Sequence, residues 1–549
     1  FDLLGLLLVF GLTWAIVRRF KVRHELKDKN PVTTETKDFI ALIILLGLSL
    51  TGYLVEAARI ANNPQEWDWC SPVGYSFSRL LPGLPDGAYI GIWWFHFGWV
   101  FAFFALLPQM RLRHIVTATL SSAGSPERPM GELVPVSMEQ VESTGMIGAA
   151  NATDFTRWHL LSLDACMECG RCTEVCPAYN VGKSLNPKKI VADMKRAHDT
   201  GAEVAATLTD EALWACTTCH ACVEACPVLI RHTDFIVDAR RHLVAEGRFA
   251  GSGAVMLRQV GSTQNAWGAA ASSREDWMKG LDVPLARDKG QFDVLFWVGC
   301  AGATDPGAIK TTKAVAKLLA KAGVDFACLG QEEACTGDPP RRVGDEFTFQ
   351  AMAESNVAMF RKYGVQRVVT ACPHCLNTLK NEYHQFGGSL EVYHHTQFLA
   401  KLVDEGQLKP AELDPGSTVY HDPCYLARVN GESDAPRRLV GESTSLNTDG
   451  PALFHALTRE HDQNKVLAEP VQFANKTLCC GAGGGRMWME EEPGHRPSER
   501  RVQQLLETGA TQVAVSCPFC RIMLDAGLKQ ADETIRLIDL AELLQDANS

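Results

Sequence analysis

The sequence contains 549 residues, carries a formal net charge of −11 and includes 19 cysteines. A chain of this length holds several domains, and its acidic balance argues against a nucleic-acid partner because no basic cluster large enough to offset it is present. Most of the cysteines stand in close-spaced ligand patterns, which indicates reduced, metal-loaded thiols at a cytoplasmic face rather than disulfides.

Three apolar segments, residues 3–17, 39–55 and 88–107, open the chain. Each approaches the length of a membrane-spanning helix, about 20 residues. Basic residues directly after the first and third segments place those ends on the cytoplasmic side. We therefore predict that residues 1–120 form a membrane arm of three transmembrane helices, with buried core helices as the alternative. The chain starts at Phe1 rather than Met, so we expect further residues or whole helices upstream.

Two histidines near the third segment suggest haem. His96 and His114 are 18 residues apart, which is five helical turns and about 27 Å on one face of a continuous helix. This spacing resembles the last helix of the cytochrome b subunit of respiratory nitrate reductase, and it predicts two stacked b haems with one of these residues at each. The alternative is a packed His96 and an interfacial His114. The remaining axial ligands would come from upstream helices or from a further membrane subunit.

After a linker at residues 121–153, residues 154–250 carry one cysteine pattern written twice. Each copy reads Cys-x-x-Cys-x-x-Cys-x-x-x-Cys-Pro, as in bacterial two-cluster ferredoxins, in which the fourth cysteine serves the other cubane [4Fe–4S] cluster. The predicted ligand sets are therefore Cys166, Cys169, Cys172 and Cys226 for one cluster, and Cys216, Cys219, Cys222 and Cys176 for the other. The helical insert at 187–214 resembles the ferredoxin domains of succinate dehydrogenase and heterodisulfide reductase. Zinc knuckles or a disulfide framework are the alternatives.

Beyond a second linker at 251–290, the chain repeats itself as residues 291–410 and 411–549. In each copy a β-branched strand runs into Cys-Pro-x-Cys, and an earlier strand also ends at a cysteine. Strands that alternate with helical patterns predict α/β units, whose sites lie at the carboxyl ends of the strands. We call these segments the first and second repeats.

The second repeat carries a Cys-Cys-Gly motif and resembles the Cys-Cys-Gly domain of heterodisulfide reductase. The resemblance implies a catalytic noncubane [4Fe–4S] cluster on five cysteines, here Cys424, Cys479, Cys480, Cys517 and Cys520. The glycines at 481–485 lack the spacing of a dinucleotide-binding loop, so we expect them to let the backbone approach a cluster.

The first repeat is a degenerate version of the same pattern. Its predicted metal ligands are Cys300, Cys335, Cys372 and Cys375. Thr336 stands where the second repeat has Cys480, so this copy holds an ordinary four-thiolate cluster, a modified cluster or none. Cys328 is either a substitute ligand or a buried structural thiol.

The order of these parts resembles the membrane-bound iron–sulfur proteins that pass electrons from electron-transfer flavoprotein to menaquinone. The predicted fold is multidomain, with all-α transmembrane helices, an α-helical two-cluster ferredoxin domain and two α/β Cys-Cys-Gly domains. The resemblance implies a multi-pass protein of the plasma (inner) membrane, with its soluble domains cytoplasmic and with the flavoprotein, menaquinone and lipid bilayer as partners. One alternative is a disulfide reductase that draws electrons from a membrane quinol. Another is an electron-transfer subunit of a separate dehydrogenase, since the chain shows no flavin motif.

Overall fold

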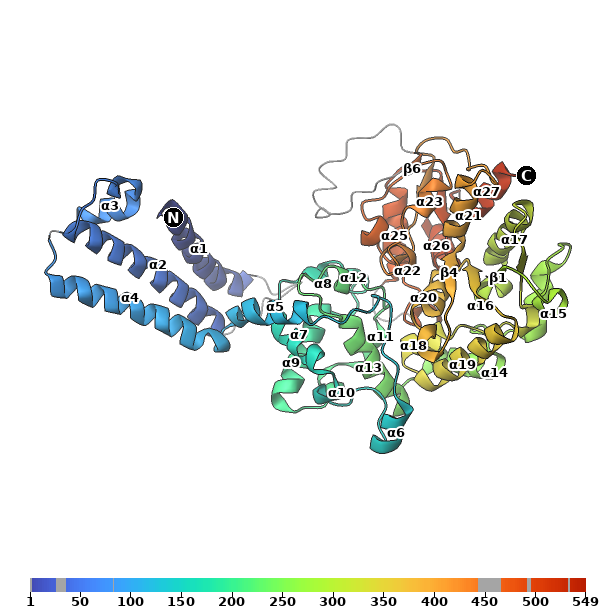
Figure 1. Cartoon of the computed structure of the whole chain (residues 1–549), viewed down its shortest axis with the longest axis horizontal. Coiled ribbons are helices and arrows are strands. Elements are labelled where there is room, and N and C mark those ends of the chain that lie inside the picture. Colours follow the sequence, from blue (N-terminus) through green and yellow to red (C-terminus); the bar gives the residue numbers. More distant parts are fainter. Residues whose placement is uncertain (1, 26–35, 82, 443–465, 491–494, 532–533) are drawn as a thin grey trace. The chain divides into compact units, whose positions relative to one another are not determined.

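The computed structural model describes residues 2–25, 36–81, 83–442, 466–490, 495–531 and 534–549 (Figure 1). The chain forms two compact units. Unit 1 comprises Phe1–Ser125 and Leu161–Gly170, and unit 2 comprises Pro126–Leu160 and Arg171–Ser549.

Unit 1 is helical, and α2 packs against α1, α3 and α4. Its helices are α1 (Asp2–Glu25), α2 (Thr36–Asn62), η1 (Asp68–Cys70), α3 (Pro72–Ser78), α4 (Asp86–Leu106), η2 (Leu107–Gln109), η3 (Arg111–Arg113) and α5 (His114–Ala123).

The prediction of three transmembrane helices is wrong. Within the described part of the chain, two helices are long and apolar enough to cross a membrane, at Asp38–Asn62 and Gly87–Gln109. In α1 the apolar run at 3–17 lies between Asp2 and Arg18, and it is about 22 Å long at 1.5 Å per residue, short of the roughly 30 Å hydrocarbon core. The fold is therefore mixed α/β with parallel sheets and two apolar helices, without the predicted multi-span arm.

The helix that was expected to carry both histidines is interrupted between them. Helix α4 ends at Leu106, and Met110 is extended, with φ −89° and ψ 161°. His114 instead begins α5. Pro108 lies in η2 between the two helices, where its missing N–H and its ring are incompatible with a continuing α-helix. The five-turn stripe through His96 and His114 is therefore absent.

Charged side chains join the end of these helices to residues 161–170, which carry Cys166 and Cys169. Arg113 contacts Asp164 at 2.8 Å, and Arg111 contacts Glu168 at 2.5 Å. Arg111 also pairs with the buried Asp38 of α2 at 2.6 Å. The segment with the first two cysteines of the ferredoxin pattern thus belongs to the same compact unit as the apolar helices.

The ferredoxin-like part of unit 2 is helical, as the insert predicted. Its elements are α6 (Met138–Thr144), η4 (Ala152–Asp154), α7 (Arg157–Ala165, which continues into unit 1), α8 (Arg171–Glu174), η5 (Tyr179–Val181), α9 (Pro187–Thr200), α10 (Val204–Thr207), α11 (Asp210–Trp214), α12 (Ala221–Glu224) and α13 (His232–Ala245). Helix α9 starts with Asn186, whose side chain accepts a hydrogen bond from the Lys189 N–H, and with Pro187 at its first position.

The two repeats build two parallel sheets with the same strand order. The first sheet is β2-β1-β3-β4 and the second is β6-β5-β7-β8. The strands are β1 (Val294–Trp297), β2 (Phe326–Ala327), β3 (Arg367–Thr370) and β4 (Glu391–His394), then β5 (Thr418–Tyr420), β6 (Leu467–Ala468), β7 (Gln512–Val515) and β8 (Arg536–Asp539). In register, Leu295 pairs with Val368 and Val419 pairs with Val513.

Helices cover both sheets in Figure 1. They are α15 (Ala286–Lys289), α16 (Gly299–Thr304), α17 (Pro306–Lys321), η7 (Gly330–Glu332), α18 (Asp338–Val343), α19 (Glu346–Lys362), α20 (Pro373–Asn381), η8 (Tyr383–Phe386) and α21 (His395–Asp404) in the first repeat, and α22 (Cys424–Ala427), α23 (Ala435–Arg438), η9 (Ala474–Lys476), η10 (Arg486–Trp488), α25 (Pro497–Leu506), α26 (Pro518–Ala531) and α27 (Leu540–Ala547) in the second. One core cluster includes Phe296 of the first sheet and Tyr420 of the second, so the repeats pack as one body.

The segment predicted as a linker at 251–290 contains ordered elements, α14 (Gly251–Thr263) and η6 (Ala271–Met278). Met256 and Val260 of α14 are buried in one cluster with Cys300 and Cys335 of the first repeat. This segment therefore covers a predicted metal site as well as connecting two domains.

Candidate metal centres

Four of the predicted ferredoxin cysteines surround one pocket. Its lining includes Cys176, Cys216, Cys219 and Cys222, with Pro177, Leu185 and Ile236 among the apolar neighbours. All four thiols are buried, and burial raises the pKa of Cys222 well above its ordinary value. We call this group the buried ferredoxin site. It is the set predicted from the crossed pattern.

The backbone of the two ferredoxin loops follows one pattern. Glu168 and Thr218 occupy equivalent places and are left-handed, with φ of 54° and 49°, and Gly170 and His220 repeat this at 84° and 59°. A β-branched residue such as Thr218 is seldom left-handed, and such strain is usually kept where a loop must wrap a ligand. The Thr218 N–H also donates to the Cys216 sulfur at 3.3 Å.

The glycine loop of the second repeat lies directly against the buried ferredoxin site. A Cβ at Gly484 would come within 2.3 Å of the Cys216 carbonyl oxygen, and one at Gly483 within 2.4 Å of the Thr217 carbonyl oxygen. The sequence predicted that these glycines let the backbone approach a cluster; the structure shows them against the backbone of the ferredoxin loop that carries Cys216. The buried Arg240 connects the ferredoxin loop to both repeats at this point. It donates to the carbonyls of Cys216 at 2.6 Å, Gly484 at 3.3 Å and Arg342 at 2.8 Å.

The five predicted cysteines of the second repeat come together at the carboxyl end of its sheet. They are Cys424, Cys479, Cys480, Cys517 and Cys520, all of them buried. Cys424 and Cys517 follow β5 and β7, and the Cys424 and Cys479 sulfurs are 3.7 Å apart. Contacts with the Cys479 and Cys520 thiols lower the pKa of Cys480 to about 5. We call this group the second-repeat site.

A direct sulfur contact links the second-repeat site to the buried ferredoxin site. The Cys219 thiol contacts the Cys479 thiol, and the contact raises the pKa of Cys219 well above its ordinary value. Cys219 and Cys479 share an apolar cluster with Cys424 and Tyr425. The Tyr425 hydroxyl is in turn 2.9 Å from the Thr218 hydroxyl of the ferredoxin loop.

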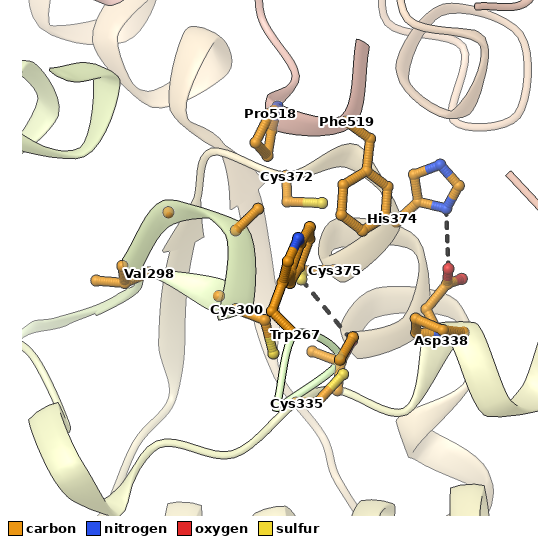
Figure 2. A pocket seen from close by; sticks show the side chains of 16 residues that line it. Trp267, Val298, Cys300, Cys335, Asp338, Cys372, His374, Cys375, Pro518 and Phe519 are labelled. Atoms are coloured by element: carbon orange, nitrogen blue, oxygen red, sulfur yellow. Dashed lines mark hydrogen bonds and ion pairs between the residues drawn. The ribbon is translucent and has the colours of Figure 1, made fainter. Parts of the chain in front are cut away.

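The four predicted cysteines of the first repeat line a second pocket, shown in Figure 2. They are Cys300, Cys335, Cys372 and Cys375, and Pro518 and Phe519 of the second repeat close one side. The Cys300 and Cys335 thiols are in contact, and this lowers the pKa of Cys300 to about 6. The Thr336 hydroxyl, at the position of Cys480, lies 3.8 Å from the Cys375 sulfur. We call this group the first-repeat site.

A buried ion pair outside the cysteine motifs supports the first-repeat site. Arg274 of η6 contacts Glu333 at 3.1 Å and the Cys300 sulfur at 3.4 Å. Glu333 accepts hydrogen bonds from the backbone of Val298 at 2.9 Å and Gly299 at 2.7 Å, which fixes the turn that carries Cys300. Burial raises the pKa of Glu333 to about 7.

A polar chain also crosses between the repeats. The Nδ1–H of His374 donates to the Asp338 carboxylate at 2.9 Å, as the dashed line in Figure 2 marks. The His374 ring also stacks on Tyr425, with 3.9 Å between the ring centroids. Sequence reasoning missed Arg274, Glu333 and His374 as site residues. The available signals were the position of His374 inside Cys-Pro-His-Cys and of Glu333 two residues before Cys335.

Cys328 is a structural thiol. It is fully buried in the apolar core cluster of the sheets, away from the lining of the first-repeat pocket. Burial raises the pKa of its thiol well above the ordinary value. It therefore does not replace the cysteine that the first repeat lacks.

The donor sets fit iron–sulfur clusters. Each of the three described sites gathers four or five thiols from separate loops. Thiolates at the corners of a small, largely apolar pocket are what a [4Fe–4S] cluster requires.

Comparison with protein families gives the same two kinds of domain. The Cysteine-rich domain family (CCG) matches residues 294–380 and 463–525, and the 4Fe-4S dicluster domain family matches residues 162–230. The chain is an iron–sulfur oxidoreductase, in agreement with the sequence prediction.

Several curated proteins resemble the chain over most of its length. It is 34% identical to "EtfAB:quinone oxidoreductase" of Syntrophomonas wolfei over 100% of this chain and 81% of the relative. It is 32% identical to "Probable iron-sulfur-binding oxidoreductase FadF" of Bacillus subtilis over 99% of this chain and 82% of the relative. It is 28% identical to a subunit of the dihydromethanophenazine:CoB--CoM heterodisulfide reductase of Methanosarcina barkeri over 72% of this chain and 96% of the relative. The chain therefore belongs to the family of CCG-domain iron–sulfur oxidoreductases that includes EtfAB:quinone oxidoreductase and FadF.

Proposed function

We propose that this protein passes electrons from a reduced electron-transfer flavoprotein to a membrane quinone, menaquinone in the first instance. Iron–sulfur clusters at the cysteine sites supply one-electron carriers. The contact between Cys219 and Cys479 carries the proposal, because it joins a ligand of the buried ferredoxin site to a ligand of the second-repeat site. A relative over the whole chain is named for the same donor and acceptor.

The ligand sets proposed from the sequence follow the crossed ferredoxin pattern. The shared pocket supports Cys176 as the fourth ligand beside Cys216, Cys219 and Cys222. Cys176→Ser should therefore remove the paramagnetic resonance signal of this cluster and leave the cluster on Cys166 intact. Loss of the Cys166 cluster alone would contradict the crossed assignment.

The membrane side of the route is proposed to begin at the segment with Cys166 and Cys169. This segment is held to the end of the apolar helices by Arg111 and Arg113, within one compact unit. None of the residues in the apolar window of α4 is buried within the protein, which suits a lipid environment. A relative that is 37% identical is named "Probable membrane-anchored ferredoxin". These observations support a membrane-associated protein, and we propose that its cysteine sites lie on the cytoplasmic side because metal-binding thiols need a reducing compartment.

His96 and His114 remain candidates for b haem ligation, each on its own helix. The Thr51 hydroxyl donates to the Gly47 carbonyl at 2.7 Å, so its oxygen accepts from His96 Nδ1 at 2.8 Å. His114 Nδ1 donates to the Arg111 carbonyl at 2.7 Å. In both rings the proton on Nδ1 leaves the Nε2 lone pair free for a metal. Each histidine changed to Ala should remove one b-type absorption band, and survival of both bands in both variants would refute haem ligation.

A disulfide reductase is the second candidate, because the heterodisulfide reductase relative matches 72% of this chain and the first-repeat pocket lies between the two repeats. One experiment separates the two functions. The dithionite-reduced protein is mixed with a menaquinone analogue, oxidised flavoprotein or a mixed disulfide, and reoxidation is followed by the return of cluster absorbance. Reoxidation by the quinone and flavoprotein is expected, and reoxidation by the disulfide alone would favour the reductase. The Cys328→Ala protein, which lacks a thiol outside all three sites, is the control and should be reoxidised by the same acceptors as the wild type.

A further inference from the structure

One buried histidine of the second repeat has no role in the ligand pattern. His421 directly follows β5, and its backbone N–H donates to the Ala514 carbonyl at 2.9 Å, which fixes it beside β7. Its side chain is fully buried. A ring nitrogen of His421 and the sulfurs of Cys480 and Cys520 lie within 4.8 Å of one another. The imidazole is thus directed at the second-repeat site.

The partner of His421 determines its tautomer. Arg501 of α25, also fully buried, donates its Nε–H to His421 Nδ1 at 2.8 Å. An arginine Nε can only donate, so Nδ1 must accept and carries no proton. The proton of the neutral ring is therefore on Nε2, and Nε2 has no hydrogen-bond partner among the described residues. A buried donor without a partner is costly, so a ligand that accepts from it is expected at this point.

This arrangement distinguishes His421 from a metal ligand. Ligation through Nε2 needs its lone pair, and the proton would then move to Nδ1 and face the Nε–H of Arg501. His96 and His114 show the opposite arrangement, with oxygen acceptors on Nδ1 and a free Nε2 lone pair. We propose that His421 is a positioning residue, whose Nε2–H donates a hydrogen bond to a thiolate or sulfide sulfur at the second-repeat site and raises the reduction potential there.

In the first repeat, other residues stand at the positions of His421 and Arg501. Trp297 stands three residues before Cys300, as His421 does before Cys424, and Asn356 stands 16 residues before Cys372, as Arg501 does before Cys517. The Asn356 amide donates instead to the Cys335 carbonyl at 3.0 Å and contacts the Tyr383 hydroxyl at 2.9 Å.

A hydrogen bond to a cluster sulfur favours the reduced, more negative state. The proposal rests on the proposed function, because it needs a cluster at the second-repeat site. His421→Leu should lower the ratio of reduced to oxidised cluster at a fixed potential roughly tenfold, which is about 59 mV for a one-electron couple. His421→Gln keeps an acceptor for Arg501 and N–H donors, and should recover most of this change.

The test is a redox titration of the full-length, cluster-loaded protein, followed by the paramagnetic resonance signal of the second-repeat site. His395→Leu is the matched control, since His395 is equally buried but contacts Asp539 at 3.1 Å rather than a cysteine. Its midpoint should equal that of the wild type. An unchanged midpoint in His421→Leu, with the signal intact, would overturn the inference.

Two further outcomes are decisive. Strong hyperfine coupling to ¹⁵N-labelled histidine would identify His421 as a direct iron ligand and overturn the donor role, whereas weak coupling that disappears in His421→Leu supports it. If His421→Leu fails to hold a cluster, the midpoint potential of His421→Gln is compared with that of the wild type. A near-wild-type midpoint supports the inference. A midpoint lowered by about 59 mV, which is a tenfold lower ratio of reduced to oxidised cluster, overturns it. Absence of a second-repeat signal in the wild type would instead refute the proposed cluster at this site.

Discussion

The first and second repeats place the same four-stranded parallel sheet beneath different sets of donors. In the first, the thiol with a lowered pKa is Cys300, which also contacts Arg274 from outside the repeat. In the second it is Cys480, the residue for which the first repeat has Thr336. The two repeats thus share the sheet and differ in the chemistry at the carboxyl ends of the strands. Within the described residues, only the second repeat has a thiol, that of Cys479, in contact with Cys219.

The largest effect should come from Cys480→Ser. Serine keeps the size of the side chain but removes the low-pKa thiol, so turnover with flavoprotein or disulfide should fall to background while any haem spectrum stays unchanged. Steady-state assays on the purified protein measure this. Unchanged turnover would move the reactive site to the first repeat and reverse the comparison.

Arg274→Met should strongly destabilise the first repeat. It leaves Glu333 buried without its partner, and breaking a buried pair in this way costs about 3–5 kcal/mol. Arg287→Met is the matched control, because its pair with Glu275 at 2.6 Å is partly exposed and should contribute about 1 kcal/mol or less. Thermal unfolding of both variants gives the difference. Equal effects would show that the buried pair does not support the Cys300 turn.

Gly484→Ala should weaken the junction between the second repeat and the ferredoxin loop. Gly484 and Gly509 both have positive φ, 65° and 76°, so alanine at either costs about 1–2 kcal/mol in backbone strain. At Gly484 the new methyl group also meets the Cys216 carbonyl, whereas Gly509 faces open space. We expect about 1–3 kcal/mol more at Gly484. Similar losses of unfolding free energy in the two variants would contradict the close approach.

The smallest change in stability, but a clear spectroscopic one, should follow Thr336→Cys. It restores a fifth cysteine beside Cys375, so the paramagnetic resonance spectrum of the first-repeat site should come to resemble that of the second. Thr336→Ser, which retains the hydroxyl and adds no thiol, should leave the spectrum as it is. A spectrum that neither substitution changes would mean that the surrounding fold, rather than the fifth cysteine, makes the spectra of the two sites differ.

Local sequence carried enough information for the repeated α/β units and for three cysteine groups that the structure brings together, while the full ligand sets stay predictions. Close spacing brings Cys216, Cys219 and Cys222 to one loop, and β-branched runs before Cys372 and Cys517 predict strands ending at a site. Pairings between distant segments could not be predicted, because a contact such as Cys219 with Cys479 depends on how whole domains pack. The same holds for Arg274, which lies in a segment whose Gly/Ser-rich composition predicted a linker.

The errors in unit 1 have physical causes too. Apolar composition alone predicted a span in α1, although its apolar run is short of the hydrocarbon thickness. Periodicity placed His96 and His114 on one face, but the break after Leu106 ended that period. Pro108 was the signal for the break, and its effect outweighed the helical pattern around it.

Arg240 holds together the backbone segments that carry the three sites of unit 2. Its guanidinium is buried without a carboxylate partner in the described part of the chain, and carbonyls from the ferredoxin loop, the first repeat and the second repeat solvate it instead. Detaching any one of these segments would strand a desolvated charge, which costs several kcal/mol. Unit 2 should therefore melt in a single cooperative transition.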